Sequence, residues 1–404
     1  MTQIGCRAAA PLDPFTAIEP GQRYGVYAEL ARTAPVHRIT LPTGVPAWLV
    51  TGRAEVRQVL TDPRVAKGPA QGGPLADHLP PDVRATVGRS LVYRNPPDHG
   101  RLRRLVAAVF TRGHVERLAP RIQRIADELL DALGDESETD LIASYAYPLP
   151  MTVICEMLGV PEADRSDFRR WSNTAIAGQF AGAEAYVEAY TRMDSYIRGL
   201  LADKRDAPTT DLLSALIDAR DDGDHLTEDE LLGMVRVLVS AGHETTVNLI
   251  GNGVHALLTH PTQLALLRAE PRRLATALEE LLRFAPPVQV TLPYITTAPI
   301  QLGVVTIPAG EIVIAGLLSA NRDPTWIGEP ARLDISRGER HHLAFGHGIH
   351  HCVGAPLARL EGQIALGTLL ARFPRLRLAV PADQLRWAPQ LLMHGLTALP
   401  VSLR

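Results

Sequence analysis

Phe345-Gly346-His347-Gly348-Ile349-His350-His351-Cys352-Val353-Gly354 places a single cysteine behind a glycine-rich turn. Ala355-Pro356-Leu357 follows directly and predicts the start of a helix, because proline favours the first helical position. A sulfur there faces the positive end of a helix dipole, which stabilises the thiolate, the form that binds metals. Phe345 and His350 add an aromatic face and a hydrogen-bond donor. The alternative is a buried structural cysteine in a turn.

The composition is that of a globular protein with a sizeable core. The chain has 404 residues, of which 46% are hydrophobic, and a formal net charge of −3, which argues against a nucleic-acid-binding protein. Cys6, Cys155 and Cys352 lie far apart and form no CxxC pair, so a zinc site or a disulfide framework is not expected. Neither a signal peptide nor a long apolar run is present, and we expect a soluble cytoplasmic protein.

The chain pattern is mainly helical with a minor β region. Length alone would suggest two or three domains, and one large helical domain around a cofactor is the main exception. We expect two strands within about 35–52 with a turn at Pro42-Thr43-Gly44 between them, and a helical core over about 101–285 that includes a helix over 115–133. Short strands over about 288–318 and a long helix over 357–373 are expected to follow. Residues 67–81 are rich in glycine and proline and predict a loop, either a binding loop or a plain linker.

One long helix carries an unusual run in its middle. Thr227 and Glu230 form a capping box, and the helical pattern continues to about His260. Ala241-Gly242-His243-Glu244-Thr245-Thr246 is poor in helix propensity, and such a conflict often indicates function. The small residues leave space, the carboxyl can carry protons, and the hydroxyl can both donate and accept. The alternative is a close helix crossing with a surface carboxylate.

The pattern F-G-x-G-x-H-x-C-x-G resembles the haem-binding loop of the cytochrome P450 family. The resemblance covers essentially the whole chain from His37 onward. It implies one α-rich domain over residues 1–404 around a buried haem b, with Cys352 as the axial iron ligand. The run Ala241–Thr246 is similar to the family's A-G-x-[D/E]-T-[T/S] motif. By that resemblance Ala241 and Gly242 border the dioxygen site, while Glu244 and Thr245 relay protons to it.

Further motifs extend the resemblance. Glu280 and Arg283 match the family's structural E-x-x-R pair, and we expect Arg332 as its third member. Alone, that motif would be an exposed ion pair worth about 0–1 kcal/mol. His99-x-x-x-Arg103 lies on one helix face and is similar to the family's haem-propionate clamp. Many relatives place an arginine after the E-x-x-R helix, also for a propionate, whereas this chain has Tyr294 there. A less neutralised propionate is therefore expected.

The predicted site residues fall into two sets beyond the catalytic run and the cysteine. Those implied to bind the cofactor are His99, Arg103, His350, Phe345, Gly346, Gly354 and Tyr294. Those expected to contact substrate are mostly apolar: Val92, Val237, Leu238, Val288, Val290, Thr291 and Leu392. Such a lining favours a hydrophobic or amphipathic small molecule.

The family resemblance implies a monomeric monooxygenase that hydroxylates a small molecule of specialised metabolism with O2 and two electrons. No flavin or iron–sulfur segment is recognisable, so a ferredoxin and its reductase are the expected electron source. Arg101, Arg104, Arg112 and Arg359 are candidate docking charges. Two alternatives remain: an enzyme of the same family that couples or cyclises its substrate without inserting oxygen, and a haem sensor or carrier.

Overall fold

The computed structural model describes residues 15, 22–42, 44–68, 78–134, 136–177, 182–219, 224–338 and 341–404. Helices dominate these ranges, and the prediction of a mainly helical chain with a minor β region is confirmed. The α-helices are α1 (Gln22–Thr33), α2 (Arg53–Thr61), α3 (Pro81–Val87), α4 (Asp98–Val109), α5 (Arg112–Arg117), α6 (Ala119–Ala132), α7 (Pro148–Met157), α8 (Arg165–Ala177), α9 (Ala183–Asp206), α10 (Leu212–Asp218), α11 (Glu228–Leu258), α12 (Pro261–Ala269), α13 (Leu274–Phe284), α14 (Leu317–Ala320) and α15 (Ala355–Arg372).

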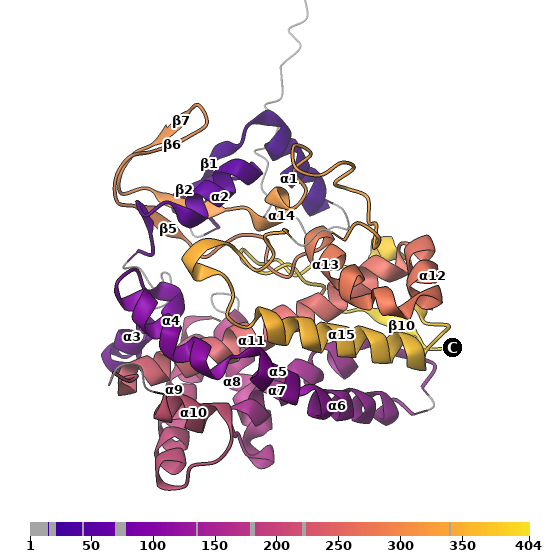
Figure 1. The fold of residues 1–404 in the computed structure, drawn as a ribbon, viewed down its shortest axis with the longest axis horizontal. Coiled ribbons are helices and arrows are strands. Elements are labelled where there is room, and N and C mark those ends of the chain that lie inside the picture. The colour runs from indigo at the N-terminus through magenta and orange to yellow at the C-terminus, as the bar shows by residue number, and fades with distance from the viewer. Residues whose placement is uncertain are drawn as a thin grey trace, which may run out of the picture.

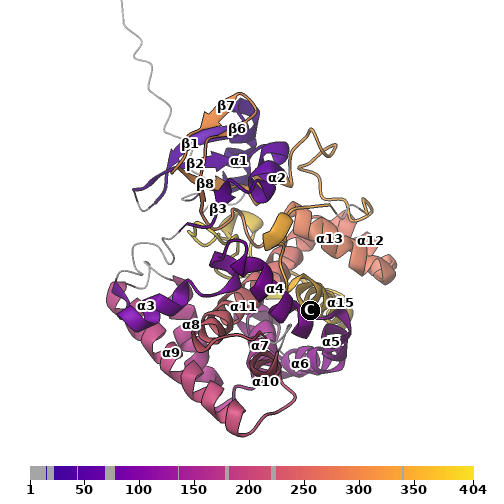
Figure 2. The ribbon, with the colours of Figure 1, turned by 60° about the vertical axis from the view of Figure 1, so that its left-hand side comes forward.

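Helix α11 runs through the helical part of the molecule (Figures 1 and 2). The predicted capping box is present, because Thr227 Oγ1 accepts from the backbone N–H of Glu230 while the Glu230 carboxylate accepts from the backbone N–H of Thr227. The helix has 31 residues, and it packs against α7, α13 and α15. Most of its residues are buried, which explains why packing sustains the helix through a run of low propensity.

A five-stranded sheet forms the other part, at the end where α1 and α2 lie (Figure 1). Its order is β1-β2-β8-β5-β3, and the predicted hairpin of β1 and β2 is confirmed. A three-stranded sheet has the order β4-β10-β9, and β6 pairs with β7. The strands are β1 (Val36–Thr40), β2 (Pro46–Val50), β3 (Val65–Ala66), β4 (Glu138–Asp140), β5 (Tyr294–Thr296), β6 (Ile300–Leu302), β7 (Val305–Ile307), β8 (Ile312–Ala315), β9 (Arg377–Leu378) and β10 (Pro400–Ser402).

The short pairing of β3 with β5 brings distant segments to one place. Val65 lies opposite Thr296 and Ala66 opposite Ile295 in an antiparallel register. The residue after β3 is Lys67, and the residue that begins β5 is Tyr294. Residues 67–68, the first part of the predicted loop, therefore lie beside the sheet, and residues 69–77 fall outside the described ranges.

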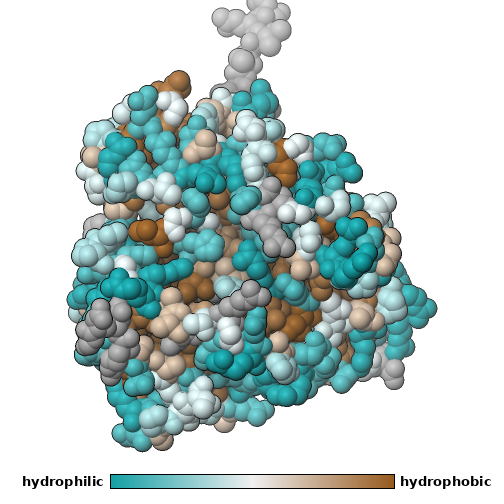
Figure 3. Space-filling model, viewed as in Figure 1, coloured by the Kyte–Doolittle hydropathy of each residue, from teal (hydrophilic) through white to brown (hydrophobic). Residues whose placement is uncertain are grey.

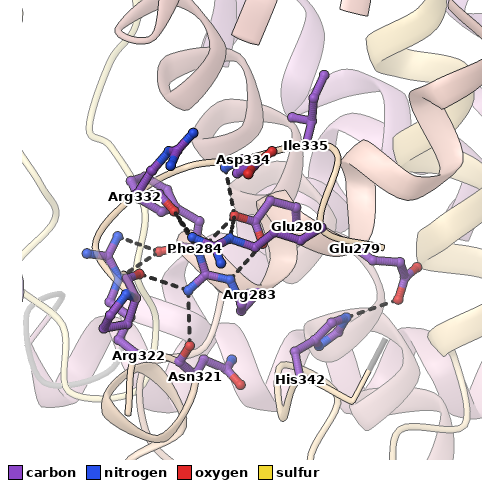
Figure 4. A network of polar contacts seen from close by, with 12 residues as sticks. Glu279, Glu280, Arg283, Phe284, Asn321, Arg322, Arg332, Asp334, Ile335 and His342 are labelled. Carbon is purple, nitrogen blue, oxygen red and sulfur yellow. Dashed lines mark hydrogen bonds and ion pairs between the residues drawn. The ribbon is translucent and has the colours of Figure 1, made fainter. Parts of the chain in front are cut away.

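A buried ion pair fixes the segment before the cysteine loop (Figure 4). Glu280 and Arg283 are 1% and 0% exposed and form two hydrogen bonds of 2.6 and 2.8 Å. The other Arg283 donors reach the carbonyl oxygens of Asn321, Pro330 and Arg332. The Glu280 carboxylate also accepts from the backbone N–H of Asp334 at 2.9 Å. We call these contacts the Glu280–Arg283 network.

The prediction that the Arg332 side chain completes this network is wrong. That side chain is exposed and pairs with Glu329 at 2.8 Å, so Arg332 contributes only its backbone carbonyl. Arg337 takes the third place, with Nε 3.5 Å from Glu280 Oε1 and a largely buried side chain. The chain turns between these two arginines, and the turn decides which of them points inward.

Candidate functional site

Backbone hydrogen bonds hold the loop that carries Cys352. The Cys352 N–H donates to the carbonyl of Phe345 at 2.9 Å, and the Gly346 N–H donates to Leu343 at 2.9 Å. Gly346 and Gly348 have φ of 72° and 71°, a region that favours glycine. A Cβ on Gly348 would lie 2.4 Å from the carbonyl oxygen of Leu60, so only glycine permits this approach.

The Cys352 thiol lies at the N-terminal end of α15. The residue keeps exposed surface although protein atoms surround its sulfur on most sides. This burial raises the pKa of the Cys352 thiol, while the backbone N–H groups of Gly354 and Ala355 and the charge of Arg103 act in the opposite direction. A bound metal cation would ionise such a thiol outright. The predicted setting of the sulfur, at a helix start with amides directed toward it, is therefore present.

Phe345 and Arg359 pack beside the loop. The Arg359 guanidinium lies 4.5 Å from the centre of the Phe345 ring and forms two hydrogen bonds with Glu279, at 2.7 and 2.8 Å. Its charge is therefore paired within the chain, and a docking role for Arg359 stays a prediction.

Three further arginines, Arg101, Arg104 and Arg112, were predicted as docking charges. Arg101 is paired with Asp224 at 3.1 Å and with Glu230, and its docking role stays a prediction as well. The side chain of Arg112 lies outside the described residues, and Arg104 stays a prediction.

The central run of α11 remains helical. The Thr245 hydroxyl donates to the carbonyl of Ala241 at 2.6 Å, the bond to the preceding turn that threonine often makes in helices. Ala241 is exposed in the middle of a mostly buried helix, so α11 has an open side at this turn. A Cβ on Gly242 would lie 3.3 Å from Ile154 Cδ1, so this glycine also permits the close crossing of α11 and α7.

Glu244 has the properties of a proton carrier. Burial raises the pKa of its carboxyl to about 7, and a side-chain hydrogen bond from Gln390 lowers it. The Oε2 atom is buried and has no hydrogen-bond partner among the described residues. A carboxyl poised near neutral pH can both give and take a proton under physiological conditions. Gln390 lies 146 positions away along the chain, and no sequence signal linked it to Glu244.

Four of the predicted cofactor-binding residues come together near the loop. The His99 and His350 rings are 4.5 Å apart between centroids, and the Tyr294 and His350 rings are 6.3 Å apart. Arg103 donates to the carbonyl of His351 at 2.7 Å. Burial, with the charges of Lys67, His99 and Arg103, lowers the pKa of His350 to about 3.

Lys67 is the member of this group that sequence reasoning missed. Its Nζ lies 3.5 Å from the centre of the Tyr294 ring, and its side chain is buried. A faint signal existed, because Lys67 is one of only two lysines in a chain rich in arginine. We call Lys67, His99, Arg103, Tyr294 and His350 the basic cluster.

The basic cluster lacks an anion within the described part of the chain. No carboxylate there contacts its members by a hydrogen bond or an ion pair, and the buried His99 Nε2 has no partner. Buried polar groups are normally paired, so this arrangement fits a ligand that carries carboxylates. Within the described ranges no group of three or more histidine, cysteine, aspartate or glutamate side chains could hold a metal ion. The residues present therefore fit a haem, with its iron on the sulfur and its propionates at the cluster.

The predicted substrate contacts divide by exposure. Val92, Val237, Val288, Thr291 and Leu392 are partly exposed, as residues that line an open surface must be. Leu238 is 8% exposed on α11. Val290 is 0% exposed and packs in the core between the sheet and α1, together with Leu49 and Ile314. The prediction for Val290 is wrong, because its side chain is fully enclosed in this core and leaves no surface for a substrate.

Hydrophobic residues gather near the middle of the face shown in Figure 3, between more polar ends. In the described ranges, no helix combines the length and the apolar character that crossing a membrane requires.

Comparison with known proteins gives consistent matches. Residues 166–394 match the family model described as cytochrome P450. The chain is 49% identical over 385 residues to cytochrome P450 107B1 of Saccharopolyspora erythraea, which covers 94% of each chain. It is 44% identical to the cytochrome P450 monooxygenase PikC of Streptomyces venezuelae, covering 100% of this chain and 97% of PikC. The solved structure of PksS, a P450 of the bacillaene polyketide synthase of Bacillus subtilis, superimposes with a TM-score of 0.88 at 38% identity and covers 97% of each chain.

Proposed function

This chain belongs to the cytochrome P450 family and is a P450 monooxygenase of the type found in secondary metabolism, and we propose that it hydroxylates a hydrophobic small molecule. The family implies a haem-thiolate cofactor and O2, and we propose haem b as that cofactor. A ferredoxin with its reductase supplies the two electrons in this proposal. The carrying observation is the Cys352 thiol at the start of α15, beside a basic cluster without an anion.

In this proposal the Cys352 thiolate would hold the haem iron. His99, Arg103 and His350 hold the propionates, and Phe345, Gly346 and Gly354 shape the loop around the sulfur. When bound, the haem supplies the activation of dioxygen, while the protein supplies position and protons. The backbone N–H groups of Gly354 and Ala355 stabilise the negative sulfur.

Glu244 and Thr245 deliver protons on the open side of α11. With a pKa of about 7, Glu244 exchanges protons readily near neutral pH, and Gln390 holds one of its oxygens. The Thr245 hydroxyl donates to Ala241 in the structure and keeps its own lone pairs available as acceptors. The exposed Ala241 leaves room beside that hydroxyl for a small molecule.

In this proposal the substrate is a hydrophobic or amphipathic compound that binds next to the exposed turn of α11 at Ala241. Support comes from the partly exposed apolar residues Val92, Val237, Val288 and Leu392, which come from four separate segments of the chain. Apolar linings of this kind, with a few polar groups such as Thr291, are typical of small-molecule sites.

Turnover under labelled dioxygen tests the function. The purified protein is first screened for compounds that shift its haem spectrum, and binders are then incubated with ferredoxin, reductase and 18O2. Hydroxylation predicts a product that gains one labelled oxygen atom. A product that has lost two hydrogens without labelled oxygen would support the coupling or cyclisation alternative, and tight binding without any product would support a sensor.

A further inference from the structure

We propose that Lys67 supplies the positive charge that Tyr294 cannot: its ammonium group pairs with a propionate of the bound haem. The proposal rests on the proposed function, because it presupposes a haem with its carboxylates at the basic cluster. It corrects the expectation of a less neutralised propionate, which followed from Tyr294 standing where many relatives have an arginine.

The sheet register places Lys67 beside Tyr294. The antiparallel pairing of Val65 with Thr296 and of Ala66 with Ile295 continues to Lys67 and Tyr294 as the next opposed residues. Directly opposed side chains on an antiparallel pair are close neighbours. The replacement for the arginine therefore comes from the strand that pairs with β5.

Asn95 fixes the backbone of Lys67 from the other side. Its Oδ1 accepts from the Lys67 N–H at 2.8 Å, and its Nδ2 donates to the Lys67 carbonyl at 2.9 Å. Asn95 lies four positions before His99, so the same short segment orients Lys67 and one member of the predicted propionate clamp. The position of Lys67 is thus determined by two elements of the cofactor site.

The Lys67 ammonium has more donors than acceptors to receive them. Lys67 is 8% exposed, and its Nζ lies over the Tyr294 ring at 3.5 Å and reaches the Leu292 carbonyl at 3.5 Å, a weak hydrogen bond. An ammonium has three donors, and no carboxylate within the described residues contacts this one. Burial accordingly lowers the pKa of Lys67 to about 7. A buried cation is stable only when paired, so the site favours an anion.

Within the described residues, the side chains around Lys67 are basic or uncharged. Tyr294 and the backbone face Lys67 directly, His350 lies beyond the tyrosine ring, and His99 and Arg103 follow. Two fixed charges, Lys67 and Arg103, would balance the two propionates of one haem. The Tyr294 ring contributes a cation–π contact that a side chain without an aromatic face could not make.

Haem release measures the predicted contact. Lys67→Met and Lys67→Arg holoproteins are mixed with excess apomyoglobin, and haem transfer is followed by absorbance. Lys204→Met is the matched control. Lys204 is the other lysine of the chain, and its ammonium pairs with Asp211 at the start of α10. We expect about tenfold faster release from Lys67→Met, corresponding to about 1.4 kcal/mol, and release within about twofold of wild type from Lys67→Arg and Lys204→Met.

Reconstitution with the dimethyl ester of iron protoporphyrin separates a charge contact from a structural role. The ester lacks the propionate charges, so Lys67→Met and wild type should then release the porphyrin at equal rates. A penalty of the same size with haem and with its ester would assign Lys67 a purely structural role and overturn the proposal, as would equal release of haem itself.

Carbon-13 labelling of lysine at Cε gives a readout that does not depend on variants. Only two side chains carry the label, and Lys204 is the internal reference. In the carbon monoxide complex, the Lys67 signal should titrate at clearly higher pH with haem than with the ester. Identical titration in both would contradict the proposal. Protein that shows no thiolate-type carbon monoxide spectrum would instead contradict the proposed function, so the two failures are distinguishable.

Discussion

The Glu280–Arg283 network and the basic cluster both contain buried basic side chains, but they differ in whether the chain supplies acceptors for the hydrogen-bond donors. In the network, Arg283 donates to the Glu280 carboxylate and to three carbonyl oxygens. In the basic cluster, Lys67 has one weak acceptor and His99 Nε2 has none. A network whose donors are paired within the chain supports the fold. A cluster whose donors lack an acceptor within the chain can bind a ligand that supplies one.

The largest expected effect comes from breaking the satisfied network. Arg283→Ala leaves the Glu280 carboxylate buried without its partner, and we expect a loss of about 3–5 kcal/mol in the free energy of unfolding, enough to prevent soluble expression. Soluble yield and urea denaturation measure this. Arg332→Ala is the control, because its side chain is exposed, and its effect should stay within about 0.5 kcal/mol. A severe effect of Arg332→Ala would restore the assignment rejected above.

The second-largest effect is expected on the rate of product formation and not on stability. Thr245→Ala removes the hydroxyl on the open side of α11, and we expect the rate of product formation to fall by about a hundredfold while stability changes little. Electron consumption and peroxide release are measured alongside product. Thr245→Ser keeps the hydroxyl and should retain most of the activity. Unchanged coupling in Thr245→Ala would show that this residue is not part of the relay.

The buried carboxyl group of Glu361 provides a third case, which is tested through the pH dependence of stability. Burial raises the pKa of Glu361 on α15 from 4.5 to about 8, although a hydrogen bond with Thr246 lowers it. The folded state therefore holds this proton more tightly than the unfolded state, and stability falls as pH rises from about 4.5 to about 8.

Glu361→Gln removes that titration. We expect the variant to gain stability relative to wild type on going from about pH 5 to about pH 9, by roughly 1–3 kcal/mol. Urea denaturation across this range measures the difference. Parallel stability curves for the two proteins would mean that Glu361 does not bind its proton more tightly in the folded state.

The smallest effect tests whether the basic cluster serves the ligand and not the fold. His99→Phe keeps an aromatic ring but removes the unpaired nitrogen, so the stability of the cofactor-free protein should change by less than about 0.5 kcal/mol. Haem release should become about fivefold to tenfold faster, which corresponds to about 1.0–1.4 kcal/mol for one hydrogen bond. A stability loss without any change in haem release would place His99 with the structural residues.

Sequence reasoning succeeded where the signal is local. The capping box at Thr227 fixed the start of α11, and the β1–β2 hairpin followed from strand alternation around a turn. The spacing of His99 and Arg103 on one helix, and of the glycines around Cys352, likewise depends on neighbours in the chain.

The missed features all depend on contacts between distant segments. Lys67 gains its meaning from Tyr294, 227 positions away, through the register of β3 and β5. Gln390 reaches Glu244 across a similar separation. Arg337 takes the place beside Glu280 that was expected for Arg332, and Val290 is enclosed by residues of the sheet and of α1 that are distant in the sequence.

Sequence also failed at helix boundaries set by packing. A single helix was expected over 115–133, whereas α5 and α6 are separate helices that meet at Leu118. Within the predicted helical core, the π-helical turn at Ile142–Ala146 and the separate helix α12 were not distinguished. These features leave weak marks in local propensity, because tertiary contacts decide them.

The carbon monoxide spectrum of the reduced protein tests the central claim most directly, since it reports which protein atom would hold the iron. With Cys352 as a thiolate ligand, wild type should show the strongly red-shifted Soret band of a sulfur-ligated complex, and Cys352→Ala should lose that band. A wild-type spectrum of the histidine-ligated type, or a band that survives in Cys352→Ala, would contradict the account.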